Sequence, residues 1–452
     1  MAESVPADLV SRTWAGDPQP PEAIPPSADV VIIGGGIIGV STAWFLARNG
    51  IDVVVCEKGH IAGEQSGRNW GWVRQQGRDR REMPMIVESL RIWRTLGDEI
   101  GEDVGFSEQG VLYLIDNDCQ LERYAAWAKF AEDYATGTRL IEPKELRGLV
   151  QGAAVQWRGA LYTASDGRAE PHKAVPALAR AVVRRGGTVL TSCAVRGIET
   201  AAGRVSAVVT EHGRIRTSTV LCAAGAWTSM FCRSLGIRVP QLKVRGTVAR
   251  TAPAELVCSG SMTDRRLALR RRQDGGYTVA HGVVIDHPVT PSTVRFGSQF
   301  MPAVRMDARH LRLSLGREFV EEMSTPKRWQ LDERSVFERC RVLNPRPNRR
   351  ILRQIRKHLD RTFPQLAATP LVESWAGMIE TTPDVVPVID EAQRLPGFFI
   401  ATGFSGHGFG IGPGAGKAIA AFVTGGDVGL DVKAFRLGRF SDGTPIRPET
   451  GV

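Results

Sequence analysis

The clearest pattern in this chain is a short apolar run that leads directly into clustered glycines. Residues 30–33 read Val-Val-Ile-Ile, as in a buried strand, and residues 34–39 follow with glycines in GxGxxG spacing. An apolar helical stretch comes next, and a second buried strand over residues 53–56 ends at Glu57. Strand, glycine turn, helix and acidic residue in this order predict the first βαβ unit of a dinucleotide-binding domain.

Each part of this unit has a physical role in holding a nucleotide. The glycines let the backbone approach a pyrophosphate, the start of the helix directs N–H groups toward it, and Glu57 accepts hydrogen bonds from a ribose. A bare structural turn is the alternative, and the same apolar stretch also mimics a membrane span, which the clustered glycines argue against. We expect nucleotide contacts from Gly34, Gly36, Ile38, Gly39, Glu57 and Lys58.

Further periodic segments predict a second set of elements after this unit. Residues 63–74 form a polar, glycine-containing loop that is too irregular for a helix or strand, which is typical of a site. Residues 240–371 alternate β-like runs with basic helices, as an inserted substrate domain would. The pattern predicts helices over 83–96, 120–135 and 172–185, and strands or extended segments over 110–115, 159–162, 188–191, 194–198 and 220–222.

Residues 397–413 carry a second glycine-rich block, which follows an apolar strand and precedes a helix that reaches Val423. Pro413 near the start of this helix and Gly425 after its end are the expected terminal signals. The glycines leave backbone N–H groups free to face a ligand. We expect that ligand to be an anion or a polarised carbonyl.

Composition narrows the class of protein. The chain has 452 residues, of which 42% are hydrophobic and 23% charged, as in a globular enzyme with more than one domain. Its net charge is +10, and residues 349–361 combine basic side chains with apolar residues at helical spacing. This helix either covers a core or docks a partner or an anionic surface. No recognition motif accompanies the charge, so we do not expect a nucleic-acid partner.

Cysteine usage and the N-terminal segment bear on the location of the protein. Seven cysteines without a CxxC pair favour neither a disulfide framework nor a zinc ribbon, and no cluster has metal-ligand spacing, so we expect no metal. A reducing cytoplasm is the simplest interpretation, with a peripheral membrane location if the protein is a dehydrogenase. Residues 1–27 are rich in proline and predict a flexible extension, since they contain no apolar signal-peptide core.

The order of these elements resembles the FAD-dependent D-amino-acid oxidase superfamily, especially its glycine oxidase and sarcosine oxidase branches and the β subunits of heteromeric sarcosine and opine oxidases. The resemblance covers about residues 29–425. The blocks that carry it are the glycine turn with Glu57, residues 66–69, residues 165–167 with Pro171, residues 223–227, Pro383, Asp384 and Pro387, and residues 403–413.

This resemblance implies an α/β fold with two domains. A glutathione-reductase-type, Rossmann-like FAD domain would comprise residues 28–105, 166–239 and 372–440. An α+β substrate domain, built on a large antiparallel sheet above the flavin, would comprise residues 106–165 and 240–371. The family's covalent flavin cysteine has no counterpart, because residues 374–377 read Ser-Trp-Ala-Gly, so the resemblance implies non-covalent FAD.

The resemblance also implies further contacts to the cofactor. Trp70 and Trp72 would shape the substrate cavity, with a role as ordinary core aromatics as the alternative. Gly410 stands where sarcosine oxidases carry a substrate-binding lysine, so substrate anchoring must differ here. The implied contacts are Ser66, Arg68, Asn69, Trp70, Gly71, Trp72, Val195, Ala224, Gly225, Trp227, Gly403, Gly406, His407, Gly408, Phe409 and Gly410.

The reaction that the resemblance implies is oxidation of the C–N bond of an amino acid or N-substituted amino acid by hydride transfer to flavin N5. The resulting imine hydrolyses to an oxo acid, and dioxygen or an electron carrier reoxidises the flavin. Arg74 is the first candidate for holding the substrate carboxylate, with a salt bridge as its alternative. Arg270 and His281 are further positioning candidates, although a structural role suits His281 better.

Two other functions remain open at this point. One is a flavin dehydrogenase of a 2-hydroxy acid, because one superfamily architecture serves both bonds. The other is a flavin subunit of a heteromeric amine or opine oxidase, which would need a partner subunit. A homo-oligomer is also compatible with the sequence.

Overall fold

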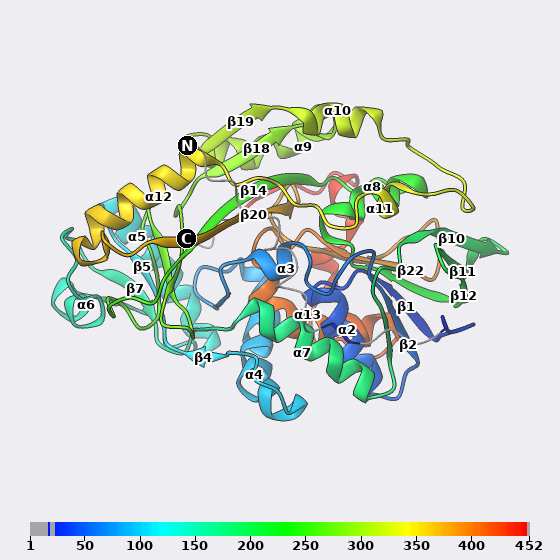
Figure 1. Ribbon diagram of the computed structural model, residues 1–452, viewed down its shortest axis with the longest axis horizontal. Coiled ribbons are helices and arrows are strands. Elements are labelled where there is room, and N and C mark those ends of the chain that lie inside the picture. The colour runs from blue at the N-terminus through cyan, green and yellow to red at the C-terminus, as the bar shows by residue number, and fades with distance from the viewer. Residues whose placement is uncertain (1–16, 19–22, 450–452) are drawn as a thin grey trace.

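The glycine-rich unit forms the centre of a six-stranded sheet in the computed structural model, which describes residues 17–18 and 23–449 (Figure 1). Five strands are parallel, and the outermost strand β21 runs antiparallel to β22. The strands, in order across the sheet, are β21 (Val388–Glu391), β22 (Phe398–Thr402), β13 (Thr219–Cys222), β1 (Val30–Ile33), β2 (Val53–Cys56) and β9 (Thr188–Leu190).

Alternation within β1 explains how this sheet is covered on both faces. Val30 and Ile32 pack into the core beneath the helices, whereas Val31 and Ile33 pack into a second core on the opposite face. That second core includes residues of a three-stranded antiparallel sheet. The elements on the two faces are the helices α2 (Ile37–Arg48), α4 (Met83–Ile100), α7 (Pro171–Arg184) and α13 (Gly408–Val423), and the strands β10 (Val195–Ala201), β11 (Arg204–Thr210) and β12 (Gly213–Arg216).

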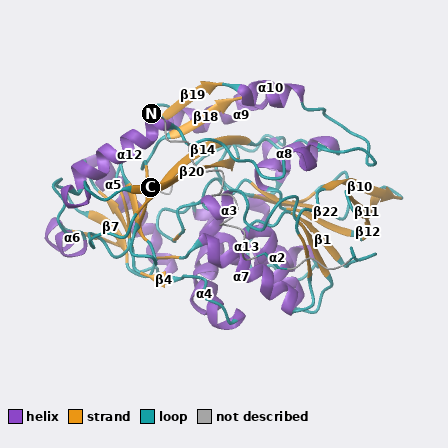
Figure 2. Cartoon of the chain, in the orientation of Figure 1, coloured by secondary structure: helices purple, strands orange, loops and turns teal. Residues whose placement is uncertain are grey.

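A ten-stranded sheet forms the second domain, and part of it lies above α2, α4, α7 and α13 in Figure 2. It is mainly antiparallel, with parallel pairing only between β5 and β15 and between β18 and β19 among the described strands. Its strands are β19 (Leu311–Leu315), β18 (Ile285–Val289), β14 (Leu242–Thr251), β17 (Tyr277–Ala280), β16 (Ala268–Arg271), β15 (Ser261–Thr263), β5 (Val111–Leu114), β7 (Ala160–Thr163) and β6 (Arg139–Ile141), with β20 (Leu371–Thr381) paired to β14. This architecture confirms the predicted fold class.

Shorter elements connect the two sheets. The strands β3 (Trp72–Val73), β8 (Gly167–Arg168) and β4 (Ser107–Glu108) form a small sheet. The other helices are α3 (Gln65–Arg68), α5 (Asp118–Ala131), α6 (Pro143–Leu149), α8 (Thr228–Ser234), α9 (Pro291–Asp307), α10 (Arg317–Ser324), α11 (Val336–Arg339) and α12 (Arg349–Thr362). The 3₁₀ turns are η1 (Arg80–Glu82), η2 (Glu132–Tyr134), η3 (Gly225–Trp227), η4 (Pro364–Leu366), η5 (Val432–Phe435) and η6 (Leu437–Phe440).

The basic amphipathic helix is confirmed as α12. Ile351, Ile355 and Leu359 are buried in a core cluster with residues of the large sheet, so the apolar face of α12 covers that sheet. The neighbouring arginines face solvent, as expected for a helix that covers a core with its apolar face.

Three expectations need correction or narrowing. The loop over residues 63–74 contains the single-turn helix α3 and the short strand β3, because β3 pairs with β8. All of β20 belongs to the large sheet, so the third segment of the FAD domain begins after this strand and not at residue 372. Most of the proline-rich extension lies outside the described residues, and Pro26 O already accepts a hydrogen bond from Arg216 N.

Within residues 17–18 and 23–449, no helix combines the length and the apolar character needed to cross a membrane. A cytoplasmic location stays a prediction.

Candidate cofactor and substrate site

A cavity that is partly open to solvent lies between the carboxyl ends of the parallel strands and the large sheet. Ligands bind in this position in open α/β sheets. The predicted cofactor residues that line the cavity are Gly34, Gly36, Ile38, Glu57, Lys58, Ser66, Asn69, Val195, Ala224, Gly225, Trp227, Gly406, Gly408 and Phe409. The predicted cofactor residues that do not line it are Gly39, Arg68, Trp70, Gly71, Trp72, Gly403, His407 and Gly410.

Close backbone packing explains the first glycines of the turn. Gly34 has φ +114°, and a Cβ there would lie 2.4 Å from the carbonyl oxygen of Ala223 on the neighbouring strand end. A Cβ on Gly39 would lie 2.1 Å from the carbonyl oxygen of Gly34, so helix α2 rests directly on the turn. Larger residues at either position would displace the backbone that faces the cavity.

Glu57 holds the turn in place from the end of β2. Its carboxylate accepts hydrogen bonds from Gly35 N at 2.8 Å and from Gly59 N at 2.7 Å. Burial raises the pKa of the Glu57 carboxyl, while the charge of Lys58 and the two N–H donors oppose that rise. The carboxylate keeps acceptor capacity for a ribose, because each oxygen carries a second lone pair.

The helix starts at the cavity offer backbone donors to an anionic or polar group. Gly36 precedes α2 without a side-chain cap, and Ser66 Oγ accepts the N–H of Ile37 at 2.9 Å. Helix α13 begins after His407 with no side-chain cap and no acidic residue in its first turn. Gln65 Oε1 is also buried at the cavity, with no hydrogen-bond partner among the residues that the structure describes. A glycine cradle, an acidic ribose acceptor and two uncapped helix starts fit FAD.

His407 supports the start of α13 from behind the cavity wall. Its Nδ1 lies 3.2 Å from Glu82 Oε1; Glu82 is buried and His407 is partly buried. Burial lowers the pKa of His407, although Glu82 opposes this. Burial opposes ionisation of Glu82, but the charges of His407 and Arg78 outweigh it and hold the pKa of Glu82 below its usual value. This pairing indicates a structural role for His407.

Close packing at the same helix start explains why residue 410 is a glycine. A Cβ on Gly410 would lie 3.0 Å from Trp72 O and 3.2 Å from Val73 Cα. Trp93 Nε1 and Ser89 Oγ both donate to Gly410 O, which anchors the turn from the other side. The close packing of α13 against β3 therefore leaves little room for a side chain here.

Arg74 follows β3 and reaches across to the large sheet. Its guanidinium carbon lies 5.4 Å from the ring centroid of Tyr113 on β5, and Nη1 donates to Gln76 O. None of the residues that the structure describes forms a salt bridge with Arg74. Nearby Asp166 is buried, which raises the pKa of its carboxyl to about 6 although it accepts the N–H groups of Gln75 and Gln76. The salt-bridge alternative for Arg74 is thus not realised within the described part of the chain.

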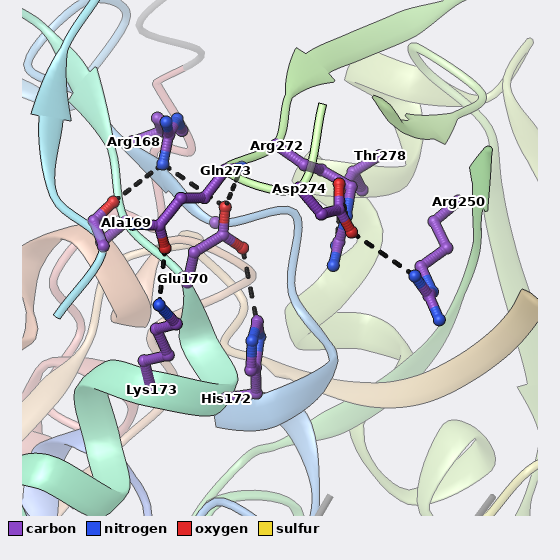
Figure 3. Close-up of polar contacts among 12 residues, drawn as sticks. Arg168, Ala169, Glu170, His172, Lys173, Arg250, Arg272, Gln273, Asp274 and Thr278 are labelled. Carbon is purple, nitrogen blue, oxygen red and sulfur yellow. Dashed lines mark hydrogen bonds and ion pairs between the residues drawn. The ribbon is translucent and has the colours of Figure 1, made fainter. Parts of the chain in front are cut away.

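Arg270 is held in a buried polar network. Its guanidinium is 1% exposed and donates to both oxygens of Glu170, at 3.0 and 3.1 Å. Glu170 has further partners (Figure 3). It accepts the N–H of Gln273 and lies within ion-pair distance of Arg168 and His172. Arg270 does not line the cofactor cavity, because this network ties it to the chain between β8 and α7.

His281 lies in a different place from the other two candidates. It lines a second cavity on the large-sheet domain together with Asp116, Arg265, Arg266, Val283 and His310. Its ring centroid is 6.0 Å from that of His358. Burial, aided by His358, lowers the pKa of His281 to about 4. The structure therefore does not bring Arg74, Arg270 and His281 together around one substrate.

Several cavity residues were missed by the sequence analysis. Glu380 on β20 is the most unusual, because burial raises the pKa of its carboxyl to about 7. Glu64 and Gln65 belong to the loop over residues 63–74 that the sequence analysis identified as a site. No sequence pattern pointed to Phe337, because it lies far from the other cavity residues in sequence, among residues expected in the substrate domain. Glu64, Gln65, Phe337 and Glu380 all line the cavity.

Comparison with known proteins agrees with this geometry. The structure matches an L-amino acid deaminase from Proteus myxofaciens with a TM-score of 0.92 and 32% identity, over 95% of this chain and 97% of that chain. The mitochondrial sarcosine dehydrogenase of Mus musculus is 26% identical over 93% of this chain, which spans 42% of that relative. The sarcosine oxidase subunit beta of Rhodobacter capsulatus is 23% identical, over 96% of this chain and 92% of the subunit. Residues 29–422 match the family described as FAD dependent oxidoreductase, and the chain belongs to that family.

Proposed function

We propose that this protein oxidises the C–N bond of an amino acid or N-substituted amino acid with FAD as the electron acceptor. The observation that carries this proposal is Arg74, a cation without a carboxylate partner among the described residues, whose backbone lies beside Gly410 at the start of α13. A guanidinium that no described carboxylate pairs with suits a substrate carboxylate.

The residues of this chain bind and orient, and the cofactor supplies the redox chemistry. When bound, FAD accepts a hydride from the substrate Cα–H. The glycine turn and Glu57 would hold the dinucleotide, and the uncapped N–H groups of α13 would stabilise negative charge on it. Arg74 would hold the substrate carboxylate. Loss of a hydride from the substrate gives an iminium ion, and water then releases an oxo acid and ammonia or an amine.

The FAD is bound without a covalent link. Cys56 is the cysteine that lines the described cavity wall, and it lies at the end of β2 beside Glu57, on the ribose side. Burial and a hydrogen bond with Cys193 raise the pKa of the Cys56 thiol, which makes it a poor nucleophile. We expect acid precipitation of the purified protein to leave all of the flavin in the supernatant.

A partner subunit is a second candidate feature. The match to the sarcosine oxidase subunit beta extends over nearly the whole of both chains, and that relative is a subunit of a larger enzyme by its name. Size exclusion of the purified chain, followed by a turnover assay of the eluted peak, tests whether the chain works alone. The names of the relatives given above do not favour a 2-hydroxy acid as substrate.

The test of the main proposal is anaerobic flavin absorbance against D- and L-amino acids, N-methyl amino acids, opines and 2-hydroxy acids. We expect an amino acid or N-substituted amino acid to bleach the flavin, and readmission of air then distinguishes dioxygen from an electron carrier as the acceptor. Bleaching by hydroxy acids alone would overturn the proposal. Failure of all compounds with the isolated chain would favour the partner-subunit candidate.

A further inference from the structure

A segment of the large-sheet domain crosses over the FAD domain. Residues 329–344, here called the strap, connect α10 to α12 and include α11, and in Figure 1 the yellow chain extends from α10 toward β10 before it returns. Trp329 Nε1 donates to Arg196 O on β10 at 2.7 Å, so the strap is attached to the FAD domain from its first residue. No motif in the sequence indicated this crossing.

The first ionic attachment of the strap lies on β10. Arg196 donates to both oxygens of Glu338, at 3.0 and 2.9 Å, in a bidentate pair. Glu338 also accepts the N–H of Ser335, which fixes the carboxylate at the start of α11. The side chains of Arg196 and Glu338 are 17% and 6% exposed, so this pair is largely shielded from water.

The second ionic attachment of the strap lies beside Lys58, the residue that follows the expected ribose acceptor Glu57. Arg341 donates to both oxygens of Glu211, at 2.7 and 2.6 Å, and also to Lys58 O at 2.8 Å. Lys58 Nζ donates in return to Arg341 O at 2.7 Å. The two backbones approach so closely that a Cβ on Gly59 would lie 2.5 Å from Arg341 O. The strap is therefore locked against the residues that directly follow Glu57.

The strap also contributes an aromatic wall to the cavity. Phe337 lines the cavity and is 4% exposed. Its ring centroid lies 5.8 Å from that of Trp227 and 5.4 Å from that of Trp329. Phe337 thus closes the cavity beside Trp227, and the residues that hold it there are the two arginine pairs.

We propose that the strap is a clasp over the adenosine half of FAD, and that the pairs Arg196–Glu338 and Arg341–Glu211 set the rate at which FAD enters and leaves. Phe337 lines the same cavity as Glu57, Lys58 and Val195, so the strap borders the part of the cavity where the expected ribose acceptor lies, and lifting it would widen the exit for this half of the cofactor. Lifting the strap breaks both bidentate pairs and the backbone contacts at Lys58. The inference rests on the FAD site of the proposed function, and it is independent of the substrate.

The test measures release of FAD from the holoprotein without any substrate. Glu338→Gln, Glu211→Gln and the double variant are diluted into buffer, and free flavin is followed by its fluorescence after ultrafiltration. Each charged hydrogen bond contributes about 1.5–3 kcal/mol, so we expect release from the double variant to be at least about tenfold faster than from wild type. The matched control is Glu145→Gln, which removes the exposed Arg139–Glu145 pair on the large-sheet domain and should leave the rate unchanged.

A second measurement uses only the wild-type protein, so its result does not depend on whether the variants fold. Trypsin cleavage at Arg339 and Arg341 in wild-type protein should be faster without FAD than with saturating FAD, because the strap lifts more often over an empty cavity. Two results would overturn the proposal. One is FAD release at the same rate from wild type and the double variant, and the other is trypsin cleavage at the same rate with and without FAD. A working clasp in a protein that oxidises none of the tested amines would instead count against the proposed function alone.

Discussion

The two ends of this site differ in the groups that form them, which are backbone groups at one end and side chains at the other. At the cofactor end, backbone groups do the binding, and glycines are required because a Cβ would strike a backbone carbonyl at 2.1–2.4 Å. At the substrate end, the candidate Arg74 packs on Tyr113 of another strand, and Arg270, outside the cavity, pairs with Glu170 from a distant part of the chain. A backbone-built site is encoded locally, whereas a side-chain-built site depends on how domains meet.

The largest effect should follow from breaking the backbone-built end. Gly34→Ala adds a Cβ 2.4 Å from Ala223 O at a residue with φ +114°, so we expect the purified variant to contain no FAD. Flavin absorbance relative to protein absorbance measures this. Gly50→Ala is the matched control, because Gly50 also has a positive φ of +77° but no atom within 4 Å of the added Cβ. Full flavin content in Gly34→Ala would show that the turn does not hold the dinucleotide.

The next effect concerns Arg270 and should appear in stability. Arg270→Ala leaves Glu170 buried with its main partner removed, so we expect the free energy of unfolding to fall by about 3–5 kcal/mol. Urea denaturation measures this change. Arg94→Ala removes a half-exposed pair with Glu108 and should cost less than about 1 kcal/mol. If Arg270→Ala were as stable as wild type but bound substrate poorly, the positioning role expected from the sequence would stand instead.

Arg270 illustrates which features of the structure can be predicted from the sequence and which cannot. The first βαβ unit, the need for glycine at positions 34 and 39, and helix α12 follow from local periodicity and sterics, and they were predictable. Nothing local shows that Arg270 meets Glu170, a hundred positions away in the chain, or that the strap carries Phe337 into the cavity. Burial and charge pairing of this kind are decided only when two sheets and a crossing segment come together.

Glu380 lies where the two ends meet, on the large sheet but facing the cofactor cavity. Its pKa is raised to about 7 from 4.5, so the folded state binds more protons than the unfolded state between these values. Stability should therefore fall by up to about 3 kcal/mol as the pH rises through that window in FAD-free protein. Urea midpoints between pH 4 and pH 8 measure this, and Glu380→Gln should lose this part of the pH dependence.

The control for Glu380 is Glu373→Gln on the same strand β20, which pairs with Arg250 outside the cavity. This variant should keep the wild-type pH profile. A Glu380→Gln protein whose midpoint still falls between pH 4.5 and pH 7 would place the titrating group elsewhere. Such a result would weaken the view that the large sheet presents a buried acid to the cofactor.

The smallest effect tests the side-chain-built end directly. Arg74→Met removes the cation expected to hold the substrate carboxylate, so KM for the amino acid substrate should rise about 10- to 100-fold, the value of one or two charged hydrogen bonds. Flavin content should stay at the wild-type level, because Arg74 does not line the cofactor cavity. His281→Asn should leave KM within about twofold, since a substitution at a remote surface cavity removes no such bond. An amine without a carboxylate separates the two roles: if Arg74→Met weakens its oxidation equally, Arg74 positions the loop after β3 and not the substrate.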